Sequence, residues 1–393
     1  MTAPRIHDPE TPEPAMNAPK AHPLKILIVS QYSFPPDKRN MNMYQRVLHG
    51  SRFATIFLLV RRGSKISPEI ENAVSLHRAP VRNRVLFVLY AGLFSLFLRF
   101  RGCRTVLTEP SGISAAGFLA SKLAGYLWAL DVWDRPRWRA GEHEQDKPAR
   151  LSDRIVFQIM RRADLYLLSV LPRAAKDIVQ EPSRCVQLYN AIDQSLVAPS
   201  ALARPDARGR TLHLAYGRSQ FWDTMGLDIV IRAVEILKDR ACPVVVHLVG
   251  RLPAEELARI ERSSAKDCLV AHGYIPISRI EFFRSIHAGL TPYVDYEDLK
   301  YIFPIKVLEH LSQGNPVIAS SIPGLCSMVQ HEYNGLLVPP RDPEALAAAI
   351  ERLQSDDLLF NRLSANALAS IRRFDVVEKH RTIFEALSAR LSA

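Results

Sequence analysis

Residues 212–250 hold a strand pattern, a helical pattern and a second strand pattern in direct succession. They read Leu212-His-Leu-Ala-Tyr-Gly217, then a helical stretch from Leu227 to Leu237, then Pro243-Val-Val-Val-His-Leu-Val-Gly250. Short runs rich in β-branched and aromatic residues indicate buried strands, and their alternation with helices is typical of βαβ units. This unit therefore predicts a parallel α/β sheet with glycines at the strand ends, where backbone can approach a ligand.

The same alternation continues on both sides of this unit. In the first half, strands are predicted at 25–30, 54–60, 105–108, 127–133, 165–170 and 185–189, with a helix at 112–123. In the second half, strands are predicted at 268–272, 289–293, 316–320 and 335–338, with helices at 280–286, 305–312 and 343–353. Two such halves predict two Rossmann-like domains facing each other across a cleft, with ligands at the carboxyl ends of the strands.

Composition shifts divide the chain. Residues 1–23 are polar and rich in proline, with no apolar run after a charged start, so we expect a disordered tail and not a secretory signal. The polar stretch before residue 211 is the best linker. We therefore expect an N-terminal domain at 24–195, a linker at 196–210, a C-terminal domain at 211–375 and a C-terminal helix at 376–393.

The net charge lies in the first half. Residues 1–200 carry 28 Lys and Arg against 17 Asp and Glu, whereas residues 201–393 carry 23 basic and 23 acidic residues. A one-sided basic excess attracts nucleic acid, anionic lipid or an acidic small molecule, or is a solvated surface. The basic residues form no stripe interleaved with aromatic residues, so we expect no nucleic-acid partner. The five cysteines form no CxxC pair, which fits a reducing cytoplasm.

One apolar run, Val85 to Leu98, is flanked by arginines on both sides. Its 14 residues are fewer than the roughly 20 that a helix needs to span a bilayer, and as a helix they would rise only about 21 Å. Two interpretations stay open: a helix buried against a sheet, and a membrane-interface helix whose arginines meet lipid phosphates. The second predicts an anionic membrane surface as a partner. The flanking arginines are Arg82, Arg84, Arg99, Arg101 and Arg104.

The segment from Tyr301 to Gly314 is the best phosphate-site candidate. Pro304 suits the start of a helix, whose first-turn amides can bind a phosphate, and Lys306 can add positive charge. Glu309, one turn after Ile305, can accept hydrogen bonds from vicinal hydroxyls such as those of a ribose. The alternative is a surface Lys–Glu pair at (i, i+3) spacing.

Three further segments follow predicted strands. Arg218, directly after Gly217, offers a planar fork for phosphate oxygens, or is a solvated loop arginine. Asp131 to Arg139 mixes aspartates, tryptophans and arginines, as ligand-facing loops or tryptophan-anchored turns do. Glu109 to Gly112 is a weaker candidate that also suits an ordinary turn.

These segments, in this order, resemble the retaining GT-B glycosyltransferases of family 4, the glycosyl transferases group 1. The resemblance covers most of residues 24–385 and is strongest from 212 to 353. Asn190-Ala-Ile-Asp193 is similar to the family's interdomain motif, and Thr108-Glu-Pro110 to a loop that usually reads His-Glu-Pro. The pieces that carry it are Ala215–Arg218, His247–Gly250, Ala271–Pro276, Leu308–Ser320 and Tyr333–Val338.

The resemblance implies a sugar transfer from a nucleotide diphosphate sugar to a glycan or lipid-linked acceptor, with retained anomeric configuration. It implies that the C-terminal domain holds the donor and that the basic N-terminal domain holds the acceptor, at the cytoplasmic face of the plasma membrane. No cofactor and no metal are expected. The donor residues it points to are Gly217, Arg218, Gly250, Tyr274, Tyr301, Ile305, Lys306 and Glu309; those on the acceptor side are Lys38, Arg39, Glu109 and Arg135.

The sequence departs from the family at several of these positions. The first glutamate of the E-x7-E signature falls on Tyr301, the lysine usually paired with the arginine falls near Met225, and the catalytic histidine falls on Asp134. Lys306 stands where the family usually has proline. We hypothesise that Lys306 replaces the missing lysine charge beside the β-phosphate, and that Arg218, Lys306 and Asp134 are the catalytic residues.

Two other functions stay open at this point. A degenerate GT-B protein would bind a nucleotide sugar or glycan without transfer, which the loss of the first glutamate and of the lysine favours. An inverting GT-B enzyme would use Asp134 as its general base.

Overall fold

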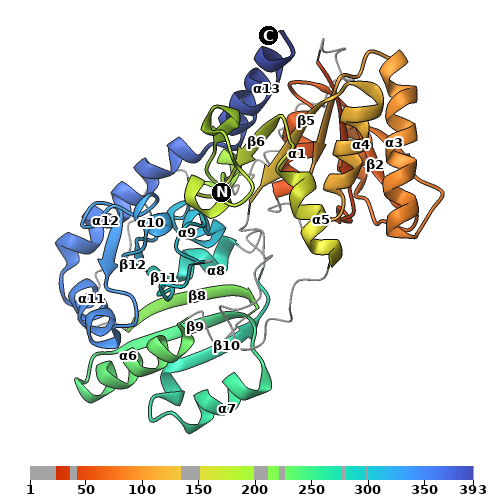
Figure 1. Cartoon of the computed structure of the whole chain (residues 1–393). Helices are drawn as coiled ribbons and strands as arrows, with labels where there is room; N and C mark the ends of the chain where they lie inside the picture. Colours follow the sequence, from red (N-terminus) through yellow and green to blue (C-terminus); the bar gives the residue numbers. More distant parts are fainter. Residues whose placement is uncertain are drawn as a thin grey trace, which may run out of the picture.

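The computed structural model describes residues 24–35, 42–133, 151–198, 211–220, 226–275, 280–297 and 299–392. Within these residues the chain forms two α/β domains, each with its own parallel sheet (Figure 1). The strands are β1 (Lys25–Ser30), β2 (Thr55–Val60), β3 (Ser75–Arg78), β4 (Thr105–Thr108), β5 (Leu127–Val132), β6 (Leu165–Leu168), β7 (Cys185–Gln187), β8 (Leu212–Gln220), β9 (Val244–Arg251), β10 (Leu269–Gly273), β11 (Ala288–Thr291), β12 (Val317–Ser320) and β13 (Gly335–Val338). The α-helices are α1 (Asn42–Gly50), α2 (Pro68–Ala73), α3 (Arg84–Phe100), α4 (Ser114–Ala124), α5 (Leu151–Met160), α6 (Leu227–Asp239), α7 (Ala254–Arg262), α8 (Ile280–Ser285), α9 (Ile305–Leu311), α10 (Pro323–Cys326), α11 (Pro343–Ser355), α12 (Asp357–Ile371) and α13 (Val376–Ser392).

Both sheets are doubly wound. The first has the order β3-β2-β1-β4-β5-β6-β7 and the second the order β10-β9-β8-β11-β12-β13. The strand order therefore reverses between β1 and β4 in one domain and between β8 and β11 in the other. Ligands of such sheets bind outside the carboxyl ends of the strands at this reversal. The predicted fold class, two Rossmann-like domains of the GT-B type, is confirmed.

Sequence patterns missed β3, α1, α2 and α5 in the first domain. Strand β3 reads Ser-Leu-His-Arg and lies at the sheet edge, where both faces are partly exposed, so it lacks an apolar run. Helix α1 contains Gln45 and Arg46, yet both side chains are buried. Helix α5 was also not predicted. The segment after the predicted strand at 165–170 forms one 3-10 turn, Pro172–Ala175.

The last helix, α13, belongs to the core of the N-terminal domain. It lies beside α1, far from the end of the C-terminal domain from which it extends (Figure 1). Ile383, Phe384 and Leu387 are buried among residues of β1, β2 and α1. A Cβ added to Gly50 would lie 2.7 Å from Cζ of Phe384, so α1 and α13 pack in close contact.

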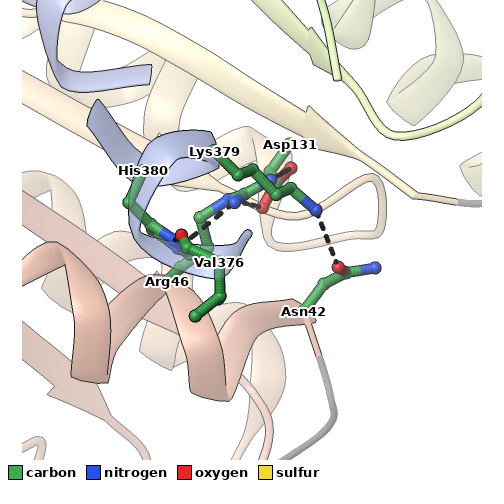
Figure 2. A network of polar contacts seen from close by, with 6 residues as sticks. All are labelled: Asn42, Arg46, Asp131, Val376, Lys379 and His380. Atoms are coloured by element: carbon green, nitrogen blue, oxygen red, sulfur yellow. Dashed lines mark hydrogen bonds and ion pairs between the residues drawn. The ribbon is translucent and has the colours of Figure 1, made fainter. Parts of the chain in front are cut away.

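A buried polar network joins α13 to the first sheet (Figure 2). Arg46 donates to both carboxylate oxygens of Asp131, at 2.7 and 3.0 Å, and both side chains are fully buried. Arg46 Nη1 also lies 3.3 Å from Nε2 of His380. The other ring nitrogen of His380, Nδ1, lies 2.6 Å from the carbonyl oxygen of Val376. Because a carbonyl only accepts, Nδ1 carries the proton and His380 is neutral. Burial, aided by the charge of Arg46, holds the pKa of His380 well below its ordinary value.

Backbone contacts join the two domains where the chain passes from one domain to the other. Ile192 pairs with Asp375, where the chain leaves and re-enters the first domain, with Ile192 N donating to Phe374 O at 2.9 Å. Val170, just beyond β6, pairs antiparallel with Ile302 of the C-terminal domain. The side-chain amide of Asn190 donates to the carbonyl of Phe303. These contacts place the segment before α9 against the carboxyl end of the first sheet.

Helix α3 is longer than predicted and is buried on one side only. Phe87, Ala91 and Leu98 pack into the core, beside α4. The opposite side exposes six large apolar residues: Val85 (68%), Leu86 (52%), Leu89 (51%), Leu93 (64%), Phe97 (50%) and Phe100 (93%). The helix is therefore buried against the domain on one face and exposes apolar side chains on the other. No helix among the described residues is long and apolar enough to cross a bilayer.

Candidate active site

The reversal between β8 and β11 gathers four polar side chains. Gly217 lies near the end of β8, and a Cβ added to it would lie 3.6 Å from Cδ and 3.8 Å from Cε of Lys306. The lysine stem therefore passes over Gly217. The guanidinium of Arg218 lies 4.5 Å from the ring centroid of Tyr293, which follows β11. The two cations predicted to face a phosphate thus come from the last part of β8 and from α9.

Lys306 and Glu309 form an ion pair on α9. Lys306 Nζ lies 2.7 Å from Glu309 Oε2, and the side chains are only 18% and 3% exposed. The (i, i+3) spacing predicted such a pair at the surface, but here the carboxylate is buried. Helix α9 has only seven residues, and Pro304 is its N-cap residue rather than its first helical residue. Positive charge at this site therefore comes from side chains more than from the helix.

The other predicted donor residues lie around this pair at different depths. Ile305 opens α9 and is half-buried. Gly250 (φ 138°) and Gly273 (φ 67°) are partners at the ends of β9 and β10, in conformations that favour glycine. Tyr274 follows them and is 59% exposed.

Tyr301 occupies a different environment from that expected of a donor ligand. Its side chain is 8% exposed and packs with the core of the N-terminal domain. Arg173 lies over its ring at 5.6 Å, and its carbonyl accepts from Leu171 N at 2.8 Å. In this structure Tyr301 is an interdomain packing residue.

On the N-terminal side, the reversal between β1 and β4 holds a buried carboxyl group. Glu109 is 1% exposed, and Ser30 Oγ donates to its Oε2 at 3.4 Å. Burial raises the pKa of Glu109 to about 8, against hydrogen bonds from Gln31, Ser30 and Ser111 that lower it. Its Oε1 has no hydrogen-bond partner among the described residues. This group is therefore largely a neutral acid at pH 7.

Several predicted positions lie outside the described residues. They are Lys38, Arg39, Asp134, Arg135 and Met225.

Tyr293, the last residue of the predicted strand at 289–293, also belongs to the site. Its side chain is fully buried, and its hydroxyl has no hydrogen-bond partner among the described residues. The sequence indicates it as a strand end, but only the folded sheet shows that this strand lies beside β8, where the strand order reverses.

A row of histidines crosses the second sheet away from this site. His213 Nδ1 lies 2.9 Å from His247 Nε2, and His247 Nδ1 lies 2.7 Å from His272 Nε2. Burial, with the neighbouring imidazoles, lowers the pKa of His247 to about 4. Nowhere in the described part of the chain do three or more His, Cys, Asp or Glu side chains form a group that could hold a metal ion. The row is joined by hydrogen bonds between the imidazoles.

Comparisons with known proteins agree with this architecture. The structure of Alr3699/HepE from Anabaena, solved with UDP and with UDP-glucose, superposes with a TM-score of 0.71 in the UDP complex; it is 18% identical and the match covers 93% of this chain and 100% of that one. Sucrose-phosphate synthase from Thermosynechococcus elongatus gives a TM-score of 0.71 at 18% identity, over 94% of this chain and 99% of that one. The fold is thus that of GT-B glycosyltransferases.

Comparison with protein families finds a match in the C-terminal domain. Residues 211–356 match the family described as glycosyl transferases group 1. D-inositol 3-phosphate glycosyltransferase from Nocardioides sp. is 28% identical over 55% of this chain and 52% of that protein. The colanic acid biosynthesis glycosyltransferase WcaL of Escherichia coli, a putative assignment, is 24% identical over 63% of this chain and 61% of its own length. The chain thus spans little more than half of these relatives, and its similarity to the glycosyl transferases group 1 lies in residues 211–356.

Proposed function

We propose that the protein transfers a sugar from a nucleotide diphosphate sugar to a glycan or lipid-linked acceptor, with retention of the anomeric configuration. The observation that carries the proposal is the convergence of Arg218, Lys306 and Glu309 at the reversal between β8 and β11. Breaking the sugar–phosphate bond places new negative charge on the departing diphosphate. Two cations, one near the end of β8 and one on α9, compensate that charge without a metal ion.

Each side chain has a separate role in the proposed site. Arg218, stacked on Tyr293, presents its planar fork to the phosphate oxygens. Lys306 turns from Glu309 toward the diphosphate, because its stem already crosses Gly217 beside the strand end. Glu309 then accepts hydrogen bonds from the ribose hydroxyls, exchanging one buried partner for another.

The first experiment is a thermal-shift panel of nucleotide sugars that begins with UDP-glucose, the ligand of the Anabaena structure. A ligand that binds only the folded chain at 100 times its Kd stabilises it by about 2.7 kcal/mol, which raises Tm measurably. A panel without any shift would contradict the donor site.

The second experiment removes the lysine charge and keeps its stem. Lys306→Met should lower sugar transfer at least about a hundredfold, the scale of losing one preorganised charge-stabilising group. Lys300→Met, in the same segment and 32% exposed, is the matched control and should keep full activity. Equal activity of the two variants would refute the role of Lys306, provided that circular dichroism shows both folded.

The acceptor is proposed to lie on the N-terminal side, near Glu109. The configuration of the product, read by NMR of the anomeric proton, tests the retaining stereochemistry. An inverted product would exclude it and favour a general base in this domain.

A second candidate function is a degenerate GT-B protein that binds a nucleotide sugar or glycan without transfer. The burial of Tyr301 in the interdomain packing favours it, because no carboxylate stands at that position. Under this function nucleotide sugars raise Tm, yet no nucleoside diphosphate is released with any donor or acceptor. Release of nucleoside diphosphate that depends on Lys306 would exclude it.

We also propose that the protein works at the cytoplasmic face of an anionic membrane, with the exposed face of α3 in the lipid interface. That face is apolar along most of its length, and Arg82, Arg84, Arg99 and Arg101 stand at its two ends. The test is co-sedimentation with vesicles of phosphatidylcholine containing phosphatidylglycerol. Leu89→Gln with Leu93→Gln should abolish it, whereas Leu257→Gln with Leu358→Gln, at exposed sites of the C-terminal domain, should not.

A further inference from the structure

A groove lies between α4 and α5, on the helix layer that also contains α3. Its volume is about 350 Å³. Helix α4 contacts both α3 and α5, so the groove belongs to the same side of the sheet as the exposed face of α3. The residues that line it are Phe118, Arg154, Ile155, Gln158, Ile159 and Arg162.

Three of these residues form an apolar floor: Phe118, Ile155 and Ile159. Phe118 and Ile159 are only partly buried where they pack against the core, beside Val156, Phe157 and Met160 of α5. Ile155 is 53% exposed. The floor therefore offers apolar surface that the described chain leaves uncovered.

The other three residues form a donor row along α5 and the turn directly after it: Arg154, Gln158 and Arg162. The four-residue spacing of Arg154 and Gln158 places them about 6 Å apart on one side of the helix. Among the side chains that the structure describes, no acidic one lines the groove. Phe118 has two cations over its ring, Arg162 at 5.7 Å and Lys122 at 5.9 Å. The groove thus combines an apolar floor with donors that suit an anion.

The packing of α4 explains why this groove stays open. A Cβ added to Gly117 would lie 2.2 Å from Nε1 of Trp128, so glycine alone lets α4 lie this close to β5. Phe118, the next residue, stands edge-on to Trp128 at 6.5 Å and reaches the boundary between α4 and α5. Its ring is only half-buried there.

We propose that this groove binds one anionic phospholipid, with an acyl chain on the apolar floor and the phosphate on the donor row. A free sugar phosphate or nucleotide would leave the floor exposed, whereas a zwitterionic lipid would bring a second cation to a basic rim. The proposal rests on the membrane position proposed above, because a bilayer against α3 would bring lipids to this side of the domain.

The test uses a phospholipid that is soluble as a monomer. Isothermal titration of the full chain with dihexanoyl phosphatidylglycerol, below its micelle concentration, should show binding, and dihexanoyl phosphatidylcholine should bind at least about tenfold more weakly. Arg154→Gln with Arg162→Gln should weaken phosphatidylglycerol binding by about tenfold or more. Arg232→Gln with Arg284→Gln removes the same charge from the C-terminal domain and should have no effect.

Three results would overturn the proposal. They are equal affinity for the two lipids, an unchanged affinity in the Arg154 and Arg162 double variant, and tighter binding of geranyl phosphate, which would assign the groove to a polyprenyl phosphate. The Leu89 and Leu93 double variant should lose vesicle binding yet keep the monomeric lipid. Failure of the groove is thereby distinguished from failure of the membrane position, and sugar transfer is measured independently of both.

Discussion

Replacing Asp131 by asparagine should destabilise the protein severely. The variant leaves the Arg46 guanidinium, 1% exposed, with an amide in place of the carboxylate that now accepts two hydrogen bonds from it. Neutral His380 cannot compensate the charge. Breaking a buried ion pair by removing one partner costs about 3–5 kcal/mol. Because a whole domain is stable by about 5–15 kcal/mol, this is a large share of its stability.

The assay is urea denaturation followed by circular dichroism, with hydrogen exchange of residues 376–392 as a local readout. Exchange in α13 should increase, because His380 of this helix contacts Arg46 of the pair. Asp131→Asn combined with Arg46→Met should recover much of the loss, since it removes the buried guanidinium that Asp131→Asn leaves unpaired. Arg240→Met is the control: its pairs with Glu344 and Glu351 are exposed, so it should cost at most about 1 kcal/mol. A cost of Asp131→Asn below that of the control would refute the reasoning.

Three further predictions concern stability. Below pH 6.5 the free energy of unfolding should fall toward pH 4, because His247 takes up a proton in the unfolded chain that the folded residue accepts only near pH 4. Urea denaturation at several pH values measures this dependence. If His247→Gln showed the same slope of unfolding free energy against pH as the native chain, the prediction would be contradicted. As pH rises from 5 to 8.5, Glu109→Gln should gain stability relative to the native chain, because the unfolded carboxyl ionises above about pH 4.5 whereas the buried one keeps its proton until about pH 8. A constant difference in the free energy of unfolding would count against it. Gly289→Ala should lower the free energy of unfolding by about 1–3 kcal/mol, because its Cβ would lie 2.3 Å from the buried ring of His310. The control is Gly112→Ala, whose Cβ meets nothing within 4 Å, and it should lose less than half of that in the same assay.

The apolar patterns of the strands could be read from the sequence because parallel strands are buried on both faces. Runs such as Lys25–Ser30 and Gly335–Val338 therefore appear without any knowledge of their neighbours. The edge strand Ser75–Arg78 lacked that signal since its faces are only partly covered. Helix α1 was missed because its polar residues are buried in a network whose partners lie up to 334 positions away.

The sequence by itself determined the class of fold, the two-domain division and the residue types at the strand ends, because these follow from short-range periodicity and from glycine and charge next to each run. Only the tertiary structure decided which of those residues meet. Gly217 and Lys306 are brought together by strand order, Tyr301 is drawn into the packing between domains, and α13 returns to the first domain. Contacts between residues far apart in the chain depend on the burial of several elements at once, which no local pattern contains.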